Sequence, residues 1–576
     1  MSSRNRKKVI GMTAITLAAW MSVEAQEPVN LDKQTAKQEA SAPIRSTTRL
    51  VQLSVVVTDK SGAPVSGLKK EDFSVLDEGR PQEIAFFSGQ LPPAVEAKSQ
   101  LPPNVFTNRY DLLGEDPGAV TIVLFDSLNT AVEDQAHVRS QVIKFLKSLK
   151  PQDHVAIYGL TNELLILHEF SQDSSALVTA AAQFKPNQKA LYDASHPEYF
   201  NVPAMIDAHS GWQRFQDAVN QENARVADQY KMRRAEMTSN AFQAIANHVA
   251  MIPGRKNVVW VSGSFPFSII VESLNAPDRV SDTTGPYAEA AARALNRANI
   301  AVYPVDATGL EVNAAMDPSN GIDYKCMDCT PEAPGPKSGM FVREERFATE
   351  RNMAAATGGQ AFIGTNDVTG AVKRAFDDGR YAYTIAFYPN HGQWNGAYRK
   401  VKVELKEPGW KLRYRAGYFA EPEHVDSESK GMAALQDAAA SPLDATNLGM
   451  IVSRKPGEPG DRNVEVHVGL DPRQLMLQHA DQRWSGAVTL YFVQRDDNGA
   501  SLAAESQKIG LNLEEKQYEY LCKAGLVLGK HVKIETQAVE LRVLVRDSNS
   551  GALGSVIVRV AAWLAPGGTA AENKAK

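Results

Sequence analysis

The sequence predicts a multidomain protein in which a doubly wound α/β domain is inserted in a β-sandwich and followed by a second, C-terminal β-sandwich. Three observations predict this fold class. Short alternating strands come first, buried strands alternate with helices from residue 119 to residue 378, and alternating strands return after Gly379. Strands that alternate with helices build parallel sheets, whereas short strands bounded by turns build sandwiches.

The composition excludes several classes of protein. Of 576 residues, 43% are hydrophobic and 22% are charged, as in an average globular protein. The formal net charge is −5, so we expect no nucleic-acid partner, because such partners require a dense basic surface. Three cysteines are too few for a disulfide framework or a zinc ribbon.

Residues 1–25 have the pattern of a secretory signal peptide. Basic residues up to Lys8 precede an apolar run from Val9 to Val23, and Ala25 stands at the expected cleavage site. A membrane anchor is the alternative, but the run is short for a span of about 20 residues. We therefore expect an exported protein, periplasmic or secreted, with no transmembrane segment after cleavage. The polar residues 26–48 are predicted to be a disordered lead-in.

Residues 49–90 are predicted to form the first part of a β-sandwich. Apolar and polar residues alternate from Val51 to Thr58, which is typical of a half-buried strand, and Asp59–Gly62 is a turn signal. Residues 91–118 are rich in proline and are predicted to be a linker.

The α/β domain, predicted over residues 119–378, opens with the apolar run Ala119–Phe125, typical of a strand buried on both faces of a sheet. A long helix is expected from about Met205 to Met251, with Arg233 and Arg234 on a solvated face. Ligands of such sheets bind at the C-terminal ends of the strands. The candidate residues therefore follow strand ends, at Asp126–Thr130 and Ser262–Ser264.

Strands return in the rest of the chain. Residues 380–418 are predicted to be the second part of the first sandwich, and residues 420–446, acidic and then rich in alanine, are predicted to be a linker. Alternating strands separated by turns predict a C-terminal β-sandwich over residues 447–566. Residues 567–576 are predicted to be a disordered tail.

Several segments together resemble a known family. They are the strand and turn at Val55–Gly62, Asp126–Thr130, Gly254–Pro266, Tyr381–Pro389 and Arg413–Tyr418. In this order they resemble the secreted bacterial proteins with a VWFA-related domain, of the acidobacterial type, a divergent branch of the von Willebrand factor A-like superfamily. The resemblance covers roughly residues 48–420 and, more weakly, the C-terminal sandwich.

This resemblance implies a degenerate metal-ion-dependent adhesion site. The family's metal site uses an aspartate, hydroxyl residues two and four positions later, a threonine and a second acid. Mapped onto this chain, the aspartate is Asp126 and the second hydroxyl is Thr130, while Leu128 takes the place of the first hydroxyl. Ser262 and its neighbours stand where the second acid is expected. No cofactor is therefore certain, and the candidates are Mg²⁺ or Ca²⁺ held by Asp126 and Thr130. Asn129 could add an amide oxygen, and Asp193 or Asp306 a carboxylate, although nothing in the sequence requires either.

A structural role for Asp126 is the alternative to metal binding, because an aspartate before a helix can cap it or hold its loop by hydrogen bonds. With so few metal ligands, we expect a partner to be bound directly. The predicted ligand-binding face consists of the side chains of Ser127, Asn129, Ser262 and Ser264. The expected partner is an envelope or extracellular protein, and the expected function is protein binding of the adhesion type.

No enzyme is predicted from the other groups of residues in the sequence. Neither a zinc-protease motif nor a nucleophile elbow is present in the sequence. Cys326 and Cys329 are expected to form a short-loop disulfide in an exported chain. The alternative function is that of an envelope enzyme or thiol redox factor that uses these two cysteines. Cys522 is expected to be reduced and buried.

Overall fold

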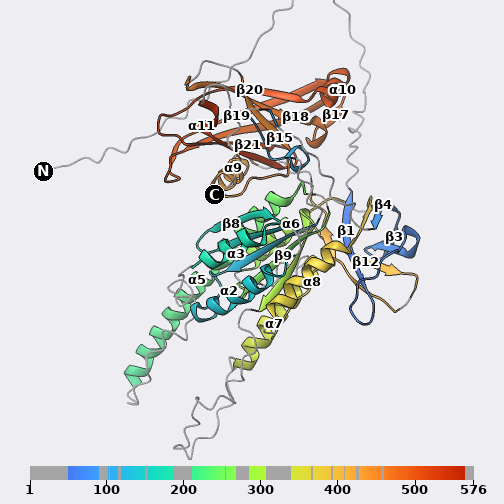
Figure 1. Cartoon of the computed structure of the whole chain (residues 1–576), viewed down its shortest axis with the longest axis vertical. Helices are drawn as coiled ribbons and strands as arrows, with labels where there is room; N and C mark the ends of the chain where they lie inside the picture. Colours follow the sequence, from blue (N-terminus) through green and yellow to red (C-terminus); the bar gives the residue numbers. More distant parts are fainter. Residues whose placement is uncertain are drawn as a thin grey trace, which may run out of the picture. The chain divides into compact units, whose positions relative to one another are not determined.

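The computed structural model (Figure 1) is a mixed α/β protein that also contains several antiparallel sheets, as the sequence predicts at this coarser level. It describes residues 50–89, 101–102, 104–113, 119–149, 154–185, 210–252, 254–267, 284–306, 339–364, 367–390, 393–407, 409–422, 427–455 and 460–564. Within these residues, no helix has both the length and the apolarity needed to cross a membrane.

A five-stranded sheet in the order β10-β9-β6-β7-β8 forms the centre of the α/β part. Its strands are β6 (Val120–Asp126), β7 (His154–Leu160), β8 (Leu164–Ser171), β9 (Lys256–Ser262) and β10 (Ile300–Asp306). Neighbouring strands are parallel except for β8, which runs antiparallel to β7 at the edge. All residues of β6, β9 and β10 are buried, which explains their nearly unbroken apolar sequences.

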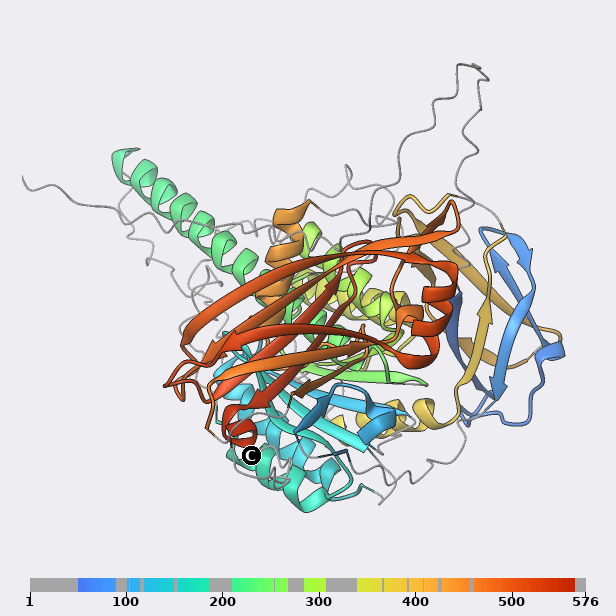
Figure 2. The ribbon, with the colours of Figure 1, turned by 90° about the horizontal axis from the view of Figure 1, so that it is seen from above.

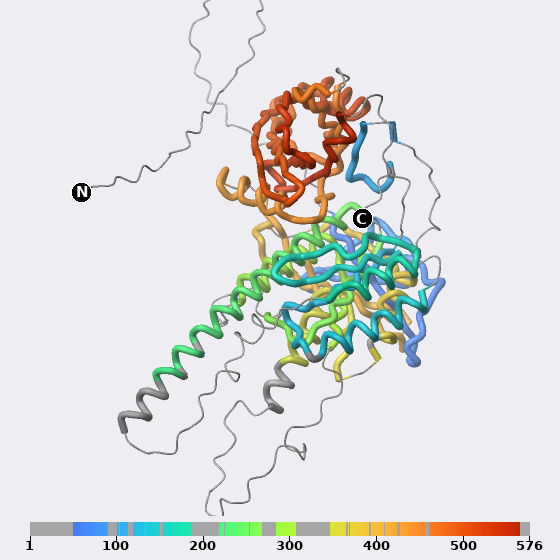
Figure 3. Tube along the Cα trace, turned by 60° about the vertical axis from the view of Figure 1, so that its left-hand side comes forward, coloured from blue at the N-terminus to red at the C-terminus, as the bar shows by residue number. Residues whose placement is uncertain are grey.

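Helices cover both faces of this sheet. Side chains of α5 (Ser210–Val249), α6 (Gly285–Arg297) and α7 (Gly339–Thr357) share one hydrophobic core with it. The opposite core includes side chains of α2 (Val132–Leu146), α3 (Ser174–Gln183) and α8 (Val368–Arg380). The buried side chains described in α5 lie at or after Ala227, and Figure 3 shows this helix extending past the strands. The result is a three-layer α/β arrangement.

Strands from before and after the α/β part pair with one another in two four-stranded sheets. One has the order β13-β1-β11-β4 and the other β14-β12-β2-β3. The early strands are β1 (Val51–Thr58), β2 (Phe73–Asp77), β3 (Arg80–Gln82) and β4 (Ile84–Gly89), with a short 3₁₀ turn, η1 (Lys70–Asp72). The late strands are β11 (Tyr383–Phe387), β12 (Tyr398–Leu405), β13 (Lys411–Arg413) and β14 (Gly417–Phe419).

Arginine side chains connect these two sheets to the α/β part. Arg415, nearly buried, donates to the backbone carbonyl of Asn296 on α6 and to the carbonyl of Gln52 on β1, at 2.6 and 2.7 Å. Arg413 donates to both carboxylate oxygens of Asp378 on α8, each at 2.6 Å. A guanidinium can bridge several elements at once because its donors point in fixed, different directions.

The C-terminal region forms two further antiparallel sheets around one hydrophobic core (Figure 2). The first has the order β20-β16-β15-β5, and the second has the order β17-β18-β21-β22, with β19 also pairing with β18. Its later strands are β15 (Met450–Arg454), β16 (Asn463–Leu470), β17 (Gln478–Ala480), β18 (Arg483–Arg495), β19 (Ser501–Glu514), β20 (Leu526–Lys533), β21 (Glu540–Asp547) and β22 (Leu553–Arg559). Three short helical segments accompany them: η6 (Pro472–Gln474), α10 (Glu515–Ala524) and α11 (Val560–Leu564).

Both predicted linkers contain structured elements, which corrects the prediction. Within 91–118, the described residues include β5 (Val105–Thr107), which pairs with β15, and α1 (Tyr110–Leu113). Within 420–446, α9 (Glu428–Ala440) buries Leu435 against strands of the C-terminal sheets. Both elements are short or rich in small residues. Only their long-range partners make them stable, and a local reading of the sequence does not show those partners.

His248, at the end of α5, lies in a buried cluster where several elements meet. Its ring nitrogens lie 3.5 Å from a carboxylate oxygen of Glu169 on β8 and 2.9 Å from the carbonyl oxygen of Asp444, which precedes the C-terminal sheets. Burial lowers the pKa of His248, but Glu169 and the Asp444 carbonyl raise it above the usual value of 6.5. Burial raises the pKa of Glu169, whereas His248 and Tyr158 bring it below the usual value of 4.5.

We expect the protein to lose thermal stability as the pH rises above 6.5, because this ion pair then disappears. A histidine whose pKa is higher in the folded than in the unfolded state contributes its full stabilisation at pH values below the unfolded-state pKa. This contribution is lost as the pH rises through the folded-state pKa. The midpoint of thermal unfolding, measured from pH 5.5 to 8.5, should fall less steeply in Glu169→Gln than in the wild type. The exposed His531 provides the control variant His531→Gln. An unchanged slope in Glu169→Gln would contradict the assignment.

Candidate functional site

The central strand of the α/β sheet ends at the point where the order of strands reverses. From β6 the chain passes through α2 to β7 on one side, and it later places β9 on the other side of β6. In open α/β sheets, ligands bind beside the C-terminal ends of the strands at such a switch point. Asp126 and Ser262 are the last residues of β6 and β9. The two strand ends singled out by the sequence therefore meet here.

The carboxylate of Asp126 is the hydrogen-bond acceptor at the centre of this site. One of its oxygens accepts from the backbone N–H of Asn129 at 2.9 Å. The other accepts from the side-chain amide of Asn129 at 2.8 Å, the indole N–H of Trp260 at 2.8 Å and the hydroxyl of Ser262 at 2.9 Å. Burial raises the pKa of Asp126 above its usual value of 3.8, and these hydrogen bonds act in the opposite direction. Asp126 thus holds its loop by hydrogen bonds, which is one of the two structural roles expected as the alternative to metal binding. It does not cap helix α2, because the residue at the N-cap position is Ala131.

Thr130 joins the two strand-end loops. Its hydroxyl donates to the backbone carbonyl of Asp126 at 2.5 Å and accepts from the backbone N–H of Gly263 at 2.8 Å. A Cβ atom at Gly263 would lie 3.2 Å from the Cα of Thr130, so a glycine there permits this close approach. The hydroxyl expected as a metal ligand is therefore part of the contact between the loops.

A positive charge reaches this site from helix α5. Arg234 is 4% exposed, and its guanidinium donates to the side-chain oxygen of Asn129 at 2.9 Å and to the hydroxyl of Ser264 at 2.8 Å. The prediction that Arg234 lies on a solvated face was therefore wrong, although the adjacent Arg233 is exposed. Asn129 donates to Asp126 and accepts from Arg234, so it connects the buried carboxylate to a buried cation.

These residues do not fit the divalent cation that the family resemblance implies. Both carboxylate oxygens of Asp126 already accept hydrogen bonds, and the indole N–H of Trp260 that faces one of them cannot bind a metal. The hydroxyl of Thr130 has one donor and one acceptor partner. A cation would also be repelled by the nearby guanidinium of Arg234.

The residues predicted to form the ligand-binding face lie together but are mostly inaccessible. Asn129 and Ser262 are fully buried, Ser127 is 3% exposed, and only Ser264 is half-buried. The side chains of Asn129 and Ser262 hold the loops together, which corrects the expectation that they are free to meet a partner. Exposed side chains at this edge come instead from the turn after β7, at Asn162 and Glu163. A role of this edge in binding stays a prediction.

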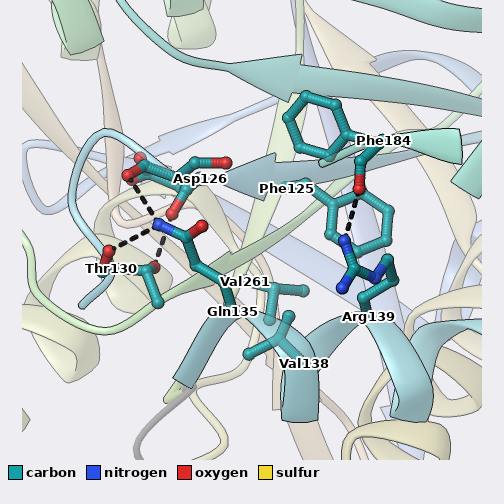
Figure 4. Close-up of a pocket in the computed structure, with 9 residues that line it drawn as sticks. Phe125, Asp126, Thr130, Gln135, Val138, Arg139, Phe184 and Val261 are labelled. Carbon is teal, nitrogen blue, oxygen red and sulfur yellow. Dashed lines mark hydrogen bonds between the residues drawn. The ribbon is translucent and has the colours of Figure 1, made fainter. Parts of the chain in front are cut away.

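A small pocket opens beside Asp126, between β6 and helix α2 (Figure 4). Its volume is about 20 Å³, close to the space that one water molecule needs. Gln135 donates to the carbonyl oxygens of Ser127 and Thr130, and Arg139 donates to the carbonyl oxygen of Phe184. These side chains stiffen the wall of the pocket, which is too small to enclose an organic ligand.

The two cysteines proposed for a disulfide, Cys326 and Cys329, lie outside the described residues. Cys522 on α10 is a free cysteine, as expected, but it is partly exposed, which corrects the prediction that it is buried. Helix α10 has no buried residue because it lies on the outside of the C-terminal sheets. In the part of the chain that the structure describes, no group of three or more histidine, cysteine or acidic side chains is placed to hold a metal ion.

Comparison with known proteins yields structural neighbours only; no family model and no curated protein matches the chain. An aerotolerance-related membrane protein from Bacteroides fragilis NCTC 9343 matches at 11% identity, over 45% of this chain and 98% of its own, with a TM-score of 0.21. The conserved hypothetical protein BatB from Bacteroides thetaiotaomicron matches at 10% identity, over 45% and 97%, with a TM-score of 0.21. The pilus adhesin SpaC from Lactobacillus rhamnosus GG matches at 8% identity, over 85% and 59%, with a TM-score of 0.22. Likenesses this weak carry no argument about function.

Proposed function

We propose that this chain is an exported protein-binding module of the adhesion type, and not an enzyme. Its α/β part would be a von Willebrand factor A-like domain inserted in the β-sandwich made by the strands on either side of it. The partner would be an envelope or extracellular protein, bound at the edge where β6, β7 and β9 end. Export rests on the sequence of residues 1–25, which lie outside the described residues.

The hydrogen-bonded loops at the switch point are the observation that carries this proposal. Asn129 donates to Asp126 and accepts from Arg234. Thr130 donates to the backbone carbonyl of Asp126 and accepts from Gly263, so these bonds would hold the loops in place without a bound ion. A rigid surface loses little conformational entropy when a partner binds. The pocket of about 20 Å³ beside Asp126 leaves no room for a substrate, so recognition at this edge of the sheet would take place at the surface.

The exposed turn after β7 gives the proposed surface its accessible groups. The backbone N–H groups of Ser127 and Leu128 both donate to the carbonyl oxygen of Leu160, so this turn is tied to the Asp126 loop. Asn162 and Glu163 are exposed in the turn, and Ser264 is half-buried beside the loop. Groups of this kind form a modest, partly polar interface. Recognition would then use direct hydrogen bonds, with no metal bridge at Asp126.

Replacing Asn162 with arginine is expected to weaken partner capture at least about tenfold, equivalent to about 1.4 kcal/mol. A long cation there would block close contact with the edge of the sheet. The immobilised protein would be incubated with envelope extract and culture medium from the organism that encodes it, and captured proteins would be quantified by mass spectrometry. EDTA should leave capture by the wild type unchanged.

Asn498→Arg is the matched control, because Asn498 is also an exposed asparagine in a turn, between strands β18 and β19 of the C-terminal sheets. It should leave capture intact. Equal capture by wild type and Asn162→Arg would place the binding surface elsewhere. Capture that EDTA abolishes and Mg²⁺ restores would contradict the direct mechanism.

A further inference from the structure

A second acidic group lies two strands away from Asp126, at the same edge of the sheet. Asp306 is the last residue of β10, and its position in the parallel pairing is directly beside Ser262. Its side chain is buried. Its carboxylate therefore belongs to the same C-terminal edge of the sheet, where ligands of α/β proteins bind.

Helix α7 brings a second carboxyl group to this end of β10. Glu350 is fully buried, and neither of its carboxyl oxygens has a hydrogen-bond partner. It lies one helical turn after Arg346, whose guanidinium is 3.4 Å from a carboxylate oxygen of Asp306. Residues one turn apart share a helix face, so Glu350 also faces the end of β10. Burial, followed by repulsion from Asp306, raises the pKa of Glu350 to about 9.

Asp126 and Glu350, both at this edge of the sheet, differ in the number of hydrogen bonds that they accept. Asp126 accepts four hydrogen bonds from three residues, whereas Glu350 accepts none. A buried polar group without a partner destabilises the fold, so it requires an explanation. A bound cation supplies one, since it would replace the missing donors and the proton of Glu350.

We propose that Asp306 and Glu350 bind a hard divalent cation, Mg²⁺ or Ca²⁺, at the C-terminal end of β10. Both cations prefer oxygen ligands, and Mg²⁺ in particular is held by one or two carboxylates with water completing its shell. Two carboxylates are fewer than a fully protein-built site uses. The nearby guanidinium of Arg346 opposes the cation, so the affinity is weak. Binding releases the proton that Glu350 carries at neutral pH.

Isothermal titration calorimetry of the full chain with MgCl₂ and with CaCl₂, after chelator treatment, tests this site. One cation should bind, and titration at pH 7 in two buffers of different ionisation enthalpy should show release of about one proton. Glu350→Gln should weaken binding more than about tenfold and abolish the proton release. Arg346→Met should tighten it, because a competing positive charge is removed.

A control variant separates this site from the rest of the molecule. Glu236→Gln removes an exposed acid on α5 and should leave binding unchanged. No binding heat for either cation, or binding that survives Glu350→Gln, would overturn the proposal and leave Glu350 as a buried neutral acid. None of these titrations contains a protein partner, so their outcome is independent of the proposed function.

Discussion

Replacing Asp126 with asparagine should lower the free energy of unfolding by about 2–4 kcal/mol. The carboxylate accepts four hydrogen bonds from groups that are themselves buried, among them the indole of Trp260. An asparagine offers one oxygen, and its amide would face donors. With its oxygen in place of the one that accepts three hydrogen bonds, the asparagine would turn its amide group toward the backbone N–H of Asn129, which would lose its buried acceptor.

Hydrogen exchange and urea denaturation measure this effect together. The amides of Asn129 and Gly263 should exchange faster in Asp126→Asn, because one is bonded to Asp126 and the other to its neighbour Thr130. Asp59, whose carboxylate is hydrogen-bonded in an exposed turn, provides the control Asp59→Asn, for which we expect a much smaller loss. Unfolding and exchange like those of the wild type would mean that the loops do not depend on this carboxylate.

Replacing Arg255 with methionine should cost about 3–5 kcal/mol, because its buried guanidinium connects separate parts of the chain. It donates to the carbonyl oxygens of Ser54 on β1 and Gly358 after α7, at 3.2 and 2.7 Å. It also donates to the hydroxyl of Tyr303 and the side-chain oxygen of Asn257. The substitution removes all four contacts and leaves buried acceptors without donors.

Arg255→Lys should recover only part of this loss, since a single ammonium cannot reach acceptors in three directions. The highly exposed Arg225 on α5 provides the matched control Arg225→Met, and its ion pair with Glu222 should contribute little. Urea denaturation followed by circular dichroism measures all three variants. An Arg255→Met protein as stable as Arg225→Met would show that the contact between β1 and the α/β part does not depend on this side chain.

Much of the architecture was predictable from local sequence. The apolar run that became β6 indicated a strand buried on both faces, and all seven of its residues are buried. The polar residues that follow β6 and β9 were expected to meet, and Ser262 does donate to Asp126. Gly254–Asn257 belongs to the segments that resemble the family, but the sequence does not predict the role of Arg255. Its acceptor on β1 is 201 residues away in sequence.

The predictions for Arg234 and for residues 105–107 were wrong for the same reason. Arg234 was expected in solvent because arginine on a long helix is usually exposed, yet it is buried against Asn129, 105 residues earlier. Residues 105–107 were expected in a linker, yet they pair with β15, more than 300 residues later in the chain. In both cases the stabilising partner is distant in sequence, so no local pattern predicts it.

Local sequence patterns are sufficient to predict where strands and helices alternate and which polar residues end the strands, because hydrophobic periodicity depends on neighbouring residues. What those polar residues do depends on tertiary packing. Buried donors and acceptors require hydrogen-bond partners. Packing places Trp260 and Asn129 beside Asp126, and Arg234 beside Asn129. The same packing left Glu350 with no hydrogen-bond partner beside Asp306. These assignments depend on which helix covers which strand end.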